Sequence, residues 1–130
     1  MSSLRENNMK QIYFSSEKTG APLSGAAESN GLIFLSGQIH LGPSGKLEGN
    51  TIEEKFAVVM GNISKILAEA GLTLADVIRV QIYLTNLGDL PSLNKVYPTY
   101  FSQPLPVRTA IGVTALPLGA SLEIDVVASR

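Results

Sequence analysis

The chain has 130 residues, of which 45% are hydrophobic and 16% are charged. This length and composition suit one folded domain with a sizeable core, and exclude a chain that is disordered by composition. Ten Lys and Arg against eleven Asp and Glu leave a net charge of -1, which does not favour nucleic acid as a partner. Cysteine is absent and His40 is the only histidine, so disulfides, thiolate nucleophiles and metal sites built from cysteines or several histidines are excluded.

The two ends of the chain differ in pattern. Residues 1–9 are polar and patternless, and we expect a flexible leader there, followed by a single domain over residues 10–130. No segment approaches the roughly 20 consecutive apolar residues that span a bilayer, and the N-terminus lacks the apolar stretch of a signal peptide. We therefore expect a cytoplasmic protein that does not interact with membranes.

The first part of the domain is typical of short strands. Strands are predicted over 10–14, 25–29 and 32–37, and Asn30-Gly31 indicates a type I′ hairpin turn between the last two. Residues 38–50 carry three glycines and a proline, which predicts a surface loop.

The most regular element follows this loop. From residue 51 to residue 70 the apolar side chains recur in steps of three, four and one, which predicts an amphipathic helix. Thr51 with Glu54 three residues later has the spacing of a capping box, and Gly71 is suited to end the helix in the left-handed conformation.

A strand and a second helix are predicted next. Residues 77–85 alternate, with the apolar face expected to hold Ile78, Val80, Ile82 and Leu84. The helix covers residues 89–101 with Asp89 as a candidate N-cap. Pro98 lies inside it and predicts a kink or an early end, because proline removes one backbone hydrogen bond.

Residues 107–114 and 121–128 also alternate and are joined by a turn-rich segment, so a closing hairpin is predicted. The resulting order, βββαβαββ, predicts an α/β fold of about six strands with two helices on one face. The strand over 32–35 is nevertheless apolar on both faces, which is typical of burial from both sides. A second copy of the chain is the expected cover for the free face.

The predicted hairpin would place Arg108 and Glu123 together on the face opposite the core. Next to Arg108, the residues Ala110 and Gly112 are too small to cover the guanidinium, which leaves space for a ligand or a neighbouring subunit. An arginine can hold a carboxylate by two parallel hydrogen bonds, and a glutamate can orient water or transfer protons. An ion pair between subunits would use the same two residues, and spacing alone leaves both interpretations open.

Four segments resemble the motifs of the RidA/YjgF family of reactive-intermediate imine deaminases. They are 35–39 (LSGQI), 93–97 (LNKVY), 106–110 (PVRTA) and 122–125 (LEID). They occur in the family's order and spacing, and the resemblance extends over roughly residues 10–128. It implies a chorismate-mutase-like α/β fold with a six-stranded mixed sheet, and a barrel-forming homotrimer with a cleft between each pair of neighbouring subunits.

The resemblance also implies roles for single residues. Arg108 matches the arginine that binds the substrate carboxylate, and Glu123 matches the acid that positions the hydrolytic water. Ser36 and Asn94 match positions near the cleft, and the backbone of Ala110 would line it. The implied reaction is the hydrolysis of reactive 2-imino or 2-enamino acids to 2-keto acids and ammonia. It needs placement and proton transfer, and neither a metal nor an organic cofactor.

Two residues depart from the family pattern. The deaminating members commonly have a Gly-Pro-Tyr segment near the N-terminus, whereas this chain has Ala21-Pro22-Leu23, so the tyrosine hydroxyl expected at the cleft is absent at Leu23. Ala110 stands where a cysteine or another polar residue is frequent. The change at Leu23 bears on substrate identity and rate, and the change at Ala110 is milder if only its backbone is used.

Alternatives to imine hydrolysis remain open from the sequence. The same cleft could hold a carboxylate metabolite without turnover in a regulatory or chaperone-like protein. Ribonuclease activity is attached to members of the family by name, but neither the charge nor a second histidine supports it here. His40 is interpreted as a solvated loop residue rather than a general base, and the aromatic cluster Tyr97, Tyr100 and Phe101 as core rather than a base-stacking surface.

Overall fold

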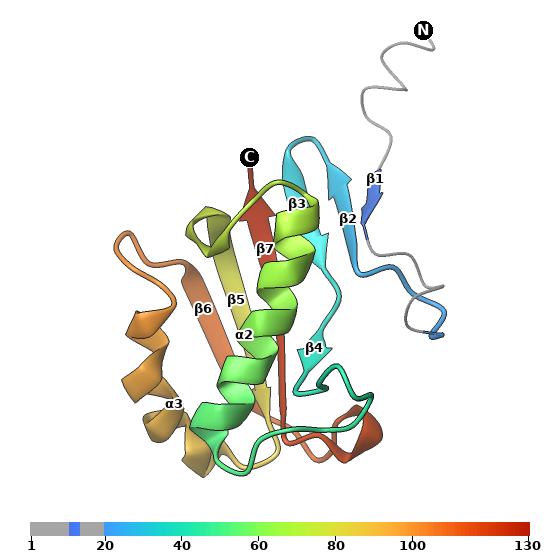
Figure 1. Cartoon of the computed structure of the whole chain (residues 1–130). Coiled ribbons are helices and arrows are strands. Elements are labelled where there is room, and N and C mark those ends of the chain that lie inside the picture. Colours follow the sequence, from blue (N-terminus) through green and yellow to red (C-terminus); the bar gives the residue numbers. More distant parts are fainter. Residues whose placement is uncertain (1–10, 14–19) are drawn as a thin grey trace, which may run out of the picture.

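The computed structural model of the chain describes residues 11–13 and 20–130. A mixed sheet of seven strands has the order β1-β2-β3-β7-β5-β6, with the short strand β4 also paired to β7. The α-helices α2 (Ile52–Glu69) and α3 (Leu90–Val96) lie on the same face of this sheet (Figure 1). The α/β class and the placement of the helices on one face are thus confirmed, while the predicted leader over residues 1–9 lies outside the described residues.

The elements have the following bounds. The strands are β1 (Gln11–Tyr13), β2 (Ala26–Ser29), β3 (Leu32–Leu35), β4 (Gln38–Ile39), β5 (Val77–Leu84), β6 (Val107–Gly112) and β7 (Leu122–Ser129). The helices are α2 (Ile52–Glu69) and α3 (Leu90–Val96), with short 3-10 turns at Leu74–Asp76, Leu87–Asp89, Tyr97–Thr99 and Pro117–Gly119.

The local turn and cap signals are confirmed. Asn30 and Gly31 have φ values of 54° and 79°, as a type I′ turn between β2 and β3 requires. At the start of α2, the Glu54 N–H donates to Thr51 Oγ1 at 3.1 Å and the Thr51 N–H donates to Glu54 Oε1 at 3.3 Å. Gly71 follows the helix with a φ of 77°, so this helix is delimited by its own sequence.

The core lies between α2 and the sheet. Its largest fully buried side chains from α2 are Phe56, Met60, Ile63 and Leu67. Pro98 ends α3 as predicted, since the chain continues as a 3-10 turn from Tyr97. The aromatic residues there belong to the core, because the Tyr97 ring lies 6.1 Å from that of Phe56 and 4.8 Å from that of Phe101.

Two features of the predicted strands are wrong in detail. Residues 38–50 are not only a loop, since Gln38 and Ile39 form β4 and pair with β7. In β5 the pairing with β7 shifts between Val77 and Arg79. This bulge turns Ile78 away from the core and leaves it 46% exposed, because one extra residue reverses the alternation of faces.

The predicted closing hairpin is also wrong. β6 pairs in parallel with β5, and β7 lies between β3 and β5. The helix α3 connects β5 to β6, and such a crossover brings two strands together in parallel rather than antiparallel orientation. Consequently Val107 and Ile111, expected in the core, are exposed on the side away from the helices, whereas Ala110 packs toward the core.

The sheet face away from the helices is open in the single chain. Phe34 of β3 is 49% exposed there and Val107 of the edge strand β6 is 64% exposed. Phe34 belongs to the strand for which a second copy of the chain is the expected cover, and Val107 extends the same open face. The homotrimer stays a prediction.

Candidate active site

The first group of site residues, the arginine cluster, consists of Arg108, Asn94 and Tyr97. Arg108 Nη1 donates to Asn94 Oδ1 at 2.8 Å, and the guanidinium carbon lies 4.9 Å from the centroid of the Tyr97 ring. Asn94 and Tyr97 are three residues apart, so they project from the same side of α3 and its continuation. A hydrogen bond and a cation–π contact therefore hold one guanidinium against one helix.

The guanidinium in this cluster keeps donors for a ligand. Within residues 11–13 and 20–130, no carboxylate forms an ion pair with Arg108, and the ion pair found in this part of the chain joins Arg130 to Glu28. Arg108 is exposed on the edge strand β6. A fixed, unneutralised guanidinium at an open edge is suited to bind a carboxylate by two parallel hydrogen bonds.

Tyr97 is the part of the arginine cluster that the sequence analysis missed. The residue was placed in the core, and its ring indeed lies there, but it also supports Arg108. Its hydroxyl is buried without a hydrogen-bond partner in the described part of the chain. Burial raises the pKa of Tyr97, and the positive charge of Arg108 acts in the opposite direction. The spacing of three residues from Asn94 is the signal that could have identified this support.

The second group, the glutamate cluster, consists of Glu123, Gly37 and Ser36. Glu123 lies on β7 with its side chain on the face away from the helices, while its neighbours Leu122 and Ile124 are buried. The Glu123 carboxyl group occupies the space beside Gly37 that a Cβ atom there would need. Burial raises the pKa of Glu123, and the nearby charge of Asp125 raises it further.

Ser36 has a structural contact in this cluster. Its hydroxyl donates to the Ser24 carbonyl oxygen at 2.6 Å, which joins the start of the β3–β4 connection to the segment that carries Leu23. Leu23 itself is 44% exposed. The segment in which the family tyrosine is expected is therefore connected to the glutamate cluster, and an apolar side chain stands there in its place.

The two clusters do not meet within one chain. Arg108 pairs in register with Val80, which pairs with Val126, and both valines are buried on the helix side of the sheet. Arg108 therefore lies on the helix side, whereas Glu123 lies on the opposite face, two strands away and three residues further along. At the usual strand dimensions this is about 10 Å in each direction. The shared face predicted for Arg108 and Glu123 is wrong, because it rested on the hairpin that the structure replaces with a parallel pair.

Ala110 lies with Arg108 on the helix side and packs against the core. The structure thus brings together Arg108 and Asn94 by direct contact, and places Ala110 on the same strand. It places Ser36 and Glu123 in the middle of the sheet order, around β4 and β7.

His40 lies in the predicted loop segment, but it is buried rather than solvated, so the prediction of a solvated residue is wrong. It is 4% exposed, with Nδ1 at 2.9 Å from the Glu48 carbonyl oxygen and Nε2 at 3.1 Å from the Ser121 nitrogen. A carbonyl can only accept and a backbone N–H can only donate, so Nδ1 carries the proton and Nε2 accepts. Both ring nitrogens are used, and His40 anchors the loop to the start of β7 instead of serving as a base.

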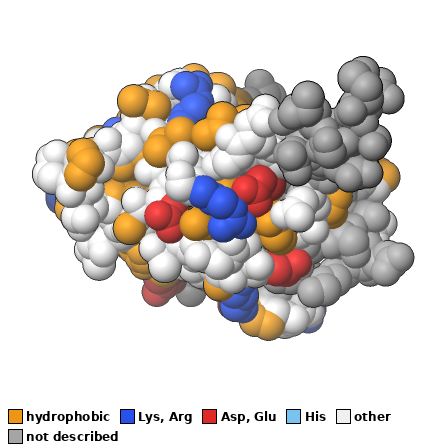
Figure 2. All heavy atoms as spheres, turned by 90° about the horizontal axis from the view of Figure 1, so that it is seen from above, with side chains coloured by type: hydrophobic (Ala, Val, Ile, Leu, Met, Phe, Trp, Pro, Cys, Tyr) orange, Lys and Arg blue, Asp and Glu red, His pale blue; other side chains and the backbone are white. Residues whose placement is uncertain are grey.

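A second exposed arginine is already paired. Figure 2 looks onto the end of the molecule where the C-terminus lies and shows basic side chains beside acidic ones. There Arg130 donates to both carboxylate oxygens of Glu28, at 2.6 and 3.0 Å, and to the Ala70 carbonyl oxygen at 2.8 Å. This arginine joins the sheet to the end of α2, and its carboxylate partner makes it a poor site for a ligand anion.

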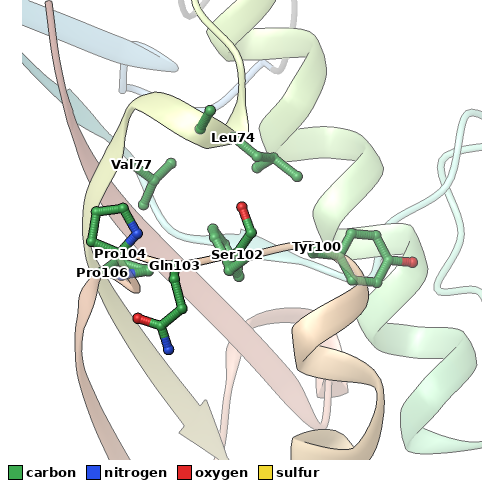
Figure 3. A pocket seen from close by; sticks show the side chains of 9 residues that line it. Leu74, Val77, Tyr100, Ser102, Gln103, Pro104 and Pro106 are labelled. Atoms are coloured by element: carbon green, nitrogen blue, oxygen red, sulfur yellow. The ribbon is translucent and has the colours of Figure 1, made fainter.

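A small cavity of about 260 Å³ lies between the turn after α2 and the segment before β6. Figure 3 shows Leu74 and Val77 facing Ser102, Gln103 and Pro104 around it. The lining residues among those described are apolar or neutral, so the cavity offers no charge to hold a carboxylate. The arginine and glutamate clusters are the stronger candidate site.

Residues 11–13 and 20–130 contain neither a membrane-spanning helix nor a cluster of metal-ligating side chains. No helix in this part is long and apolar enough to cross a membrane. No group of three or more metal-ligating side chains lies close enough together there to hold a metal ion. The cytoplasmic location stays a prediction.

The fold and the two clusters define a small α/β protein with an exposed arginine on an open sheet edge. Comparison with known proteins specifies the family. A family model described as Endoribonuclease L-PSP matches residues 15–130. Reactive Intermediate Deaminase A, chloroplastic, from Arabidopsis thaliana is 35% identical over 98% of this chain and 70% of its own length. A RutC family protein from Aquifex aeolicus is 41% identical over 84% of this chain and 89% of its own length.

Solved structures agree with these relatives. A protein of the conserved Rid family from Yersinia pestis superposes with a TM-score of 0.86 at 34% identity, over 94% of this chain and 100% of its own. RidA from an Antarctic Psychrobacter gives 0.80 at 32% identity, over 85% and 89%. The chain belongs to the RidA/YjgF family, which the family model names Endoribonuclease L-PSP. Both names describe a family of enzymes.

Proposed function

We propose that this protein hydrolyses reactive 2-imino acids, and the 2-enamino acids that tautomerise to them, to 2-keto acids and ammonia. The main support for this proposal is the environment of the Arg108 guanidinium. It is held by Asn94 and Tyr97 and has no carboxylate partner among the described residues. Membership of the family and the name of the Arabidopsis relative support the same reaction.

Arg108 binds the substrate in this proposal. Two of its N–H groups donate to the carboxylate beside the imine carbon, and the contact with Asn94 keeps the guanidinium plane in a fixed orientation. Binding through the carboxylate fixes the position of the adjacent C=N bond, so that a water molecule can be held in line with the imine carbon.

Glu123 moves the protons. The water oxygen forms a bond to the imine carbon as the C=N π electrons move to nitrogen; in this step the water gives one proton to Glu123 and Glu123 gives one proton to the nitrogen. The resulting carbinolamine then loses ammonia: the C–N bond breaks with its electrons on nitrogen, which takes a proton from Glu123, and Glu123 takes the hydroxyl proton as the hydroxyl becomes the carbonyl of the keto acid. A single carboxyl group thus accepts and returns one proton per step, and atoms and charge balance.

The reaction requires a cleft between subunits. Because Arg108 and Glu123 lie on opposite faces of one sheet, we propose that the arginine cluster of one subunit meets the glutamate cluster of its neighbour in a homotrimer. The exposed apolar face of the sheet, with Phe34 and Val107, supports such an assembly. The absence of a tyrosine at Leu23 leaves proton transfer to Glu123 and gives the cleft an apolar wall at that point.

The test is an imine-hydrolysis assay with the imine generated in place by an amino-acid oxidase. The native chain should accelerate formation of keto acid and ammonia, and Arg108→Ala should reduce kcat/KM by about 100-fold, the value of a lost charge-assisted pair of hydrogen bonds. Arg108→Lys should recover part of the loss, and Lys46→Ala on the exposed loop should have no effect.

Two other outcomes would contradict this function. Saturable binding of a small carboxylate without any turnover would identify a binding or regulatory protein instead. Loss of RNA that persists through repurification and disappears in Arg108→Ala, with no imine turnover, would identify a ribonuclease.

A further inference from the structure

The strand β4 is short for its place in the glutamate cluster. Its two residues pair in register with Ile124 and Glu123 of β7, and it pairs with no other strand among the described residues. Gly37, beside which the Glu123 carboxyl group lies, comes directly before β4. Two residue pairs give few backbone hydrogen bonds, so contacts outside this ladder are needed to keep Gly37 beside Glu123.

His40 follows β4 and supplies such a contact. Alternation along the strand turns its ring to the helix side of the sheet, opposite to Glu123, and the residue is 4% exposed. Its Nε2 accepts the N–H of Ser121 at 3.1 Å, and its Nδ1 donates to the Glu48 carbonyl oxygen at 2.9 Å. The Glu48 N–H in turn donates to the His40 carbonyl oxygen at 2.8 Å. One imidazole therefore joins the end of β4 to its own loop and to the residue before β7.

Ser121 is a fixed point for this contact. Its hydroxyl oxygen accepts a hydrogen bond from Lys55 Nζ of α2 at 2.9 Å, and its carbonyl oxygen accepts one from the Thr85 N–H at the end of β5 at 3.2 Å. The same helix also holds the β4 segment, since Asn62 Nδ2 donates to the carbonyl oxygens of the residues on either side of His40, at 3.3 and 2.9 Å. Contacts from α2 and β5 thus fix the start of β7, and His40 connects β4 to it.

We propose that His40 is a positioning residue for Glu123: by accepting the Ser121 N–H it holds β4 against β7, and so keeps Gly37 beside the Glu123 carboxyl group. The inference rests on the proposed imine hydrolysis and adds to it a residue that does not touch the substrate. Such a role suits a buried side chain whose two ring nitrogens are both used.

His40 acts on Glu123 through position and not through charge. With the proton on Nδ1 and an accepted hydrogen bond on Nε2 the ring is neutral, and it lies on the opposite face of the sheet. The charged groups on the side of Glu123 include Asp125, two residues along β7, and the Arg108 guanidinium that the proposed cleft brings from the neighbouring copy. Substitution of His40 changes neither charge, so a change at Glu123 reports its position.

Two substitutions separate the two hydrogen bonds of His40. In His40→Gln the amide oxygen reaches about as far as Nε2 and can accept the Ser121 N–H, whereas the shorter side chain of His40→Asn can serve only the Glu48 carbonyl. His40→Asn should lower kcat for imine hydrolysis about tenfold, because the carboxyl group is present but less well placed. KM should change little because Arg108 binds the substrate. The NMR signal of the Glu123 carboxyl carbon should move in His40→Asn, and His40→Gln should recover most of both losses.

Ser44→Ala is the matched control, because it removes side-chain hydrogen bonds of the same loop that do not involve Ser121. Its kcat and its Glu123 signal should stay native. The native chain gives a second test that needs no substitution: His40 is the only histidine, so the nitrogen NMR spectrum of its imidazole should show the proton on Nδ1. This measurement keeps the test decisive if His40→Asn fails to fold.

Three results would overturn the inference even when imine hydrolysis is confirmed. They are a proton on Nε2, native kcat and a native Glu123 signal in His40→Asn, and equal losses in His40→Asn and His40→Gln, as a merely structural role would give. If the Glu123 signal moves in His40→Asn and returns in His40→Gln while the native chain hydrolyses no imine, the positioning stands and the proposed reaction fails.

Discussion

The arginine cluster and the glutamate cluster differ in how exposed their charged group is and in which contacts position it. Arg108 is exposed, and its position comes from contacts across elements, between β6 and α3. Glu123 is partly buried; its carboxyl group fills the space beside Gly37, and its backbone pairs in register with Tyr83 of β5. A group that binds a charged ligand gains from remaining accessible, while a group that moves protons gains from partial removal of water.

This difference also indicates what each cluster lacks. The arginine cluster stands at an unpaired sheet edge with nothing opposite its free donors among the described residues. The glutamate cluster lies on an open face where the described part of the chain offers no free cation to hold a substrate carboxylate, since Arg79 is already bound to Gln81. Each cluster supplies what the other is missing, which is the physical reason to place the reaction between two copies of the chain.

The largest expected effect in the glutamate cluster comes from Gly37→Ala. The added Cβ occupies the space of the Glu123 carboxyl group, and the carboxyl must move because it is the flexible end of a side chain. We expect kcat/KM to fall by about 100-fold, as for a misplaced proton-transfer group, while the thermal unfolding midpoint changes little.

Gly61→Ala in the middle of α2 is the control for this variant. A Cβ there meets nothing within 4 Å, and alanine favours the helix over glycine by about 1 kcal/mol. Stability should therefore rise and activity should stay. Full activity of Gly37→Ala would show that the observed position of Glu123 is not the one used in the reaction.

A smaller effect is expected in the arginine cluster from Asn94→Ala. Arg108 loses the acceptor that orients its guanidinium but keeps the Tyr97 ring beneath it. We expect KM to rise by about tenfold, the equivalent of one hydrogen bond to a charged group, with a smaller change in kcat. Steady-state kinetics beside the exposed variant Asn50→Ala would measure this, and an unchanged KM would argue against Asn94 as the support of Arg108.

The smallest effect is expected from Tyr97→Phe, which separates the role of the Tyr97 ring from that of its hydroxyl group. The hydroxyl is buried without a partner in the described part of the chain, and such a group destabilises a fold. Tyr97→Phe should raise the free energy of unfolding by about 1 kcal/mol and leave kcat/KM unchanged, because the ring still contacts Arg108. Denaturant unfolding measures the first quantity, and a loss of stability would show that the hydroxyl has a partner in the assembled protein.

The sequence predicted the features that depend on neighbouring residues. The Thr51 capping box, the Asn30-Gly31 turn and the end of α3 at Pro98 all follow from local hydrogen bonding and backbone conformation. The family motifs identified Arg108, Asn94 and Glu123 as candidates before any geometry was known.

The predictions that were wrong concern features that depend on contacts between segments far apart in the sequence. The alternation of apolar and polar residues in β6 is compatible with a strand beside β7 or beside β5. The crossover through α3 decides between the two positions. The bulge at Ile78 is invisible without the partner strand. The burial of His40 depends on Ser121, which lies 81 residues away. The predicted shared sheet face of Arg108 and Glu123 was wrong because it depended on which strands pair, although both residues were correctly named as candidates.

The most direct measurement mixes two inactive chains. Arg108→Ala and Glu123→Gln subunits are dissociated together and reassembled, and mixed oligomers are verified by mass spectrometry before the imine assay. In the composite site, random equal mixing gives roughly a quarter of the clefts both native groups, so activity should return to about that fraction of the native value. Verified mixed oligomers that stay as inactive as either variant alone would contradict a site shared between two copies of the chain.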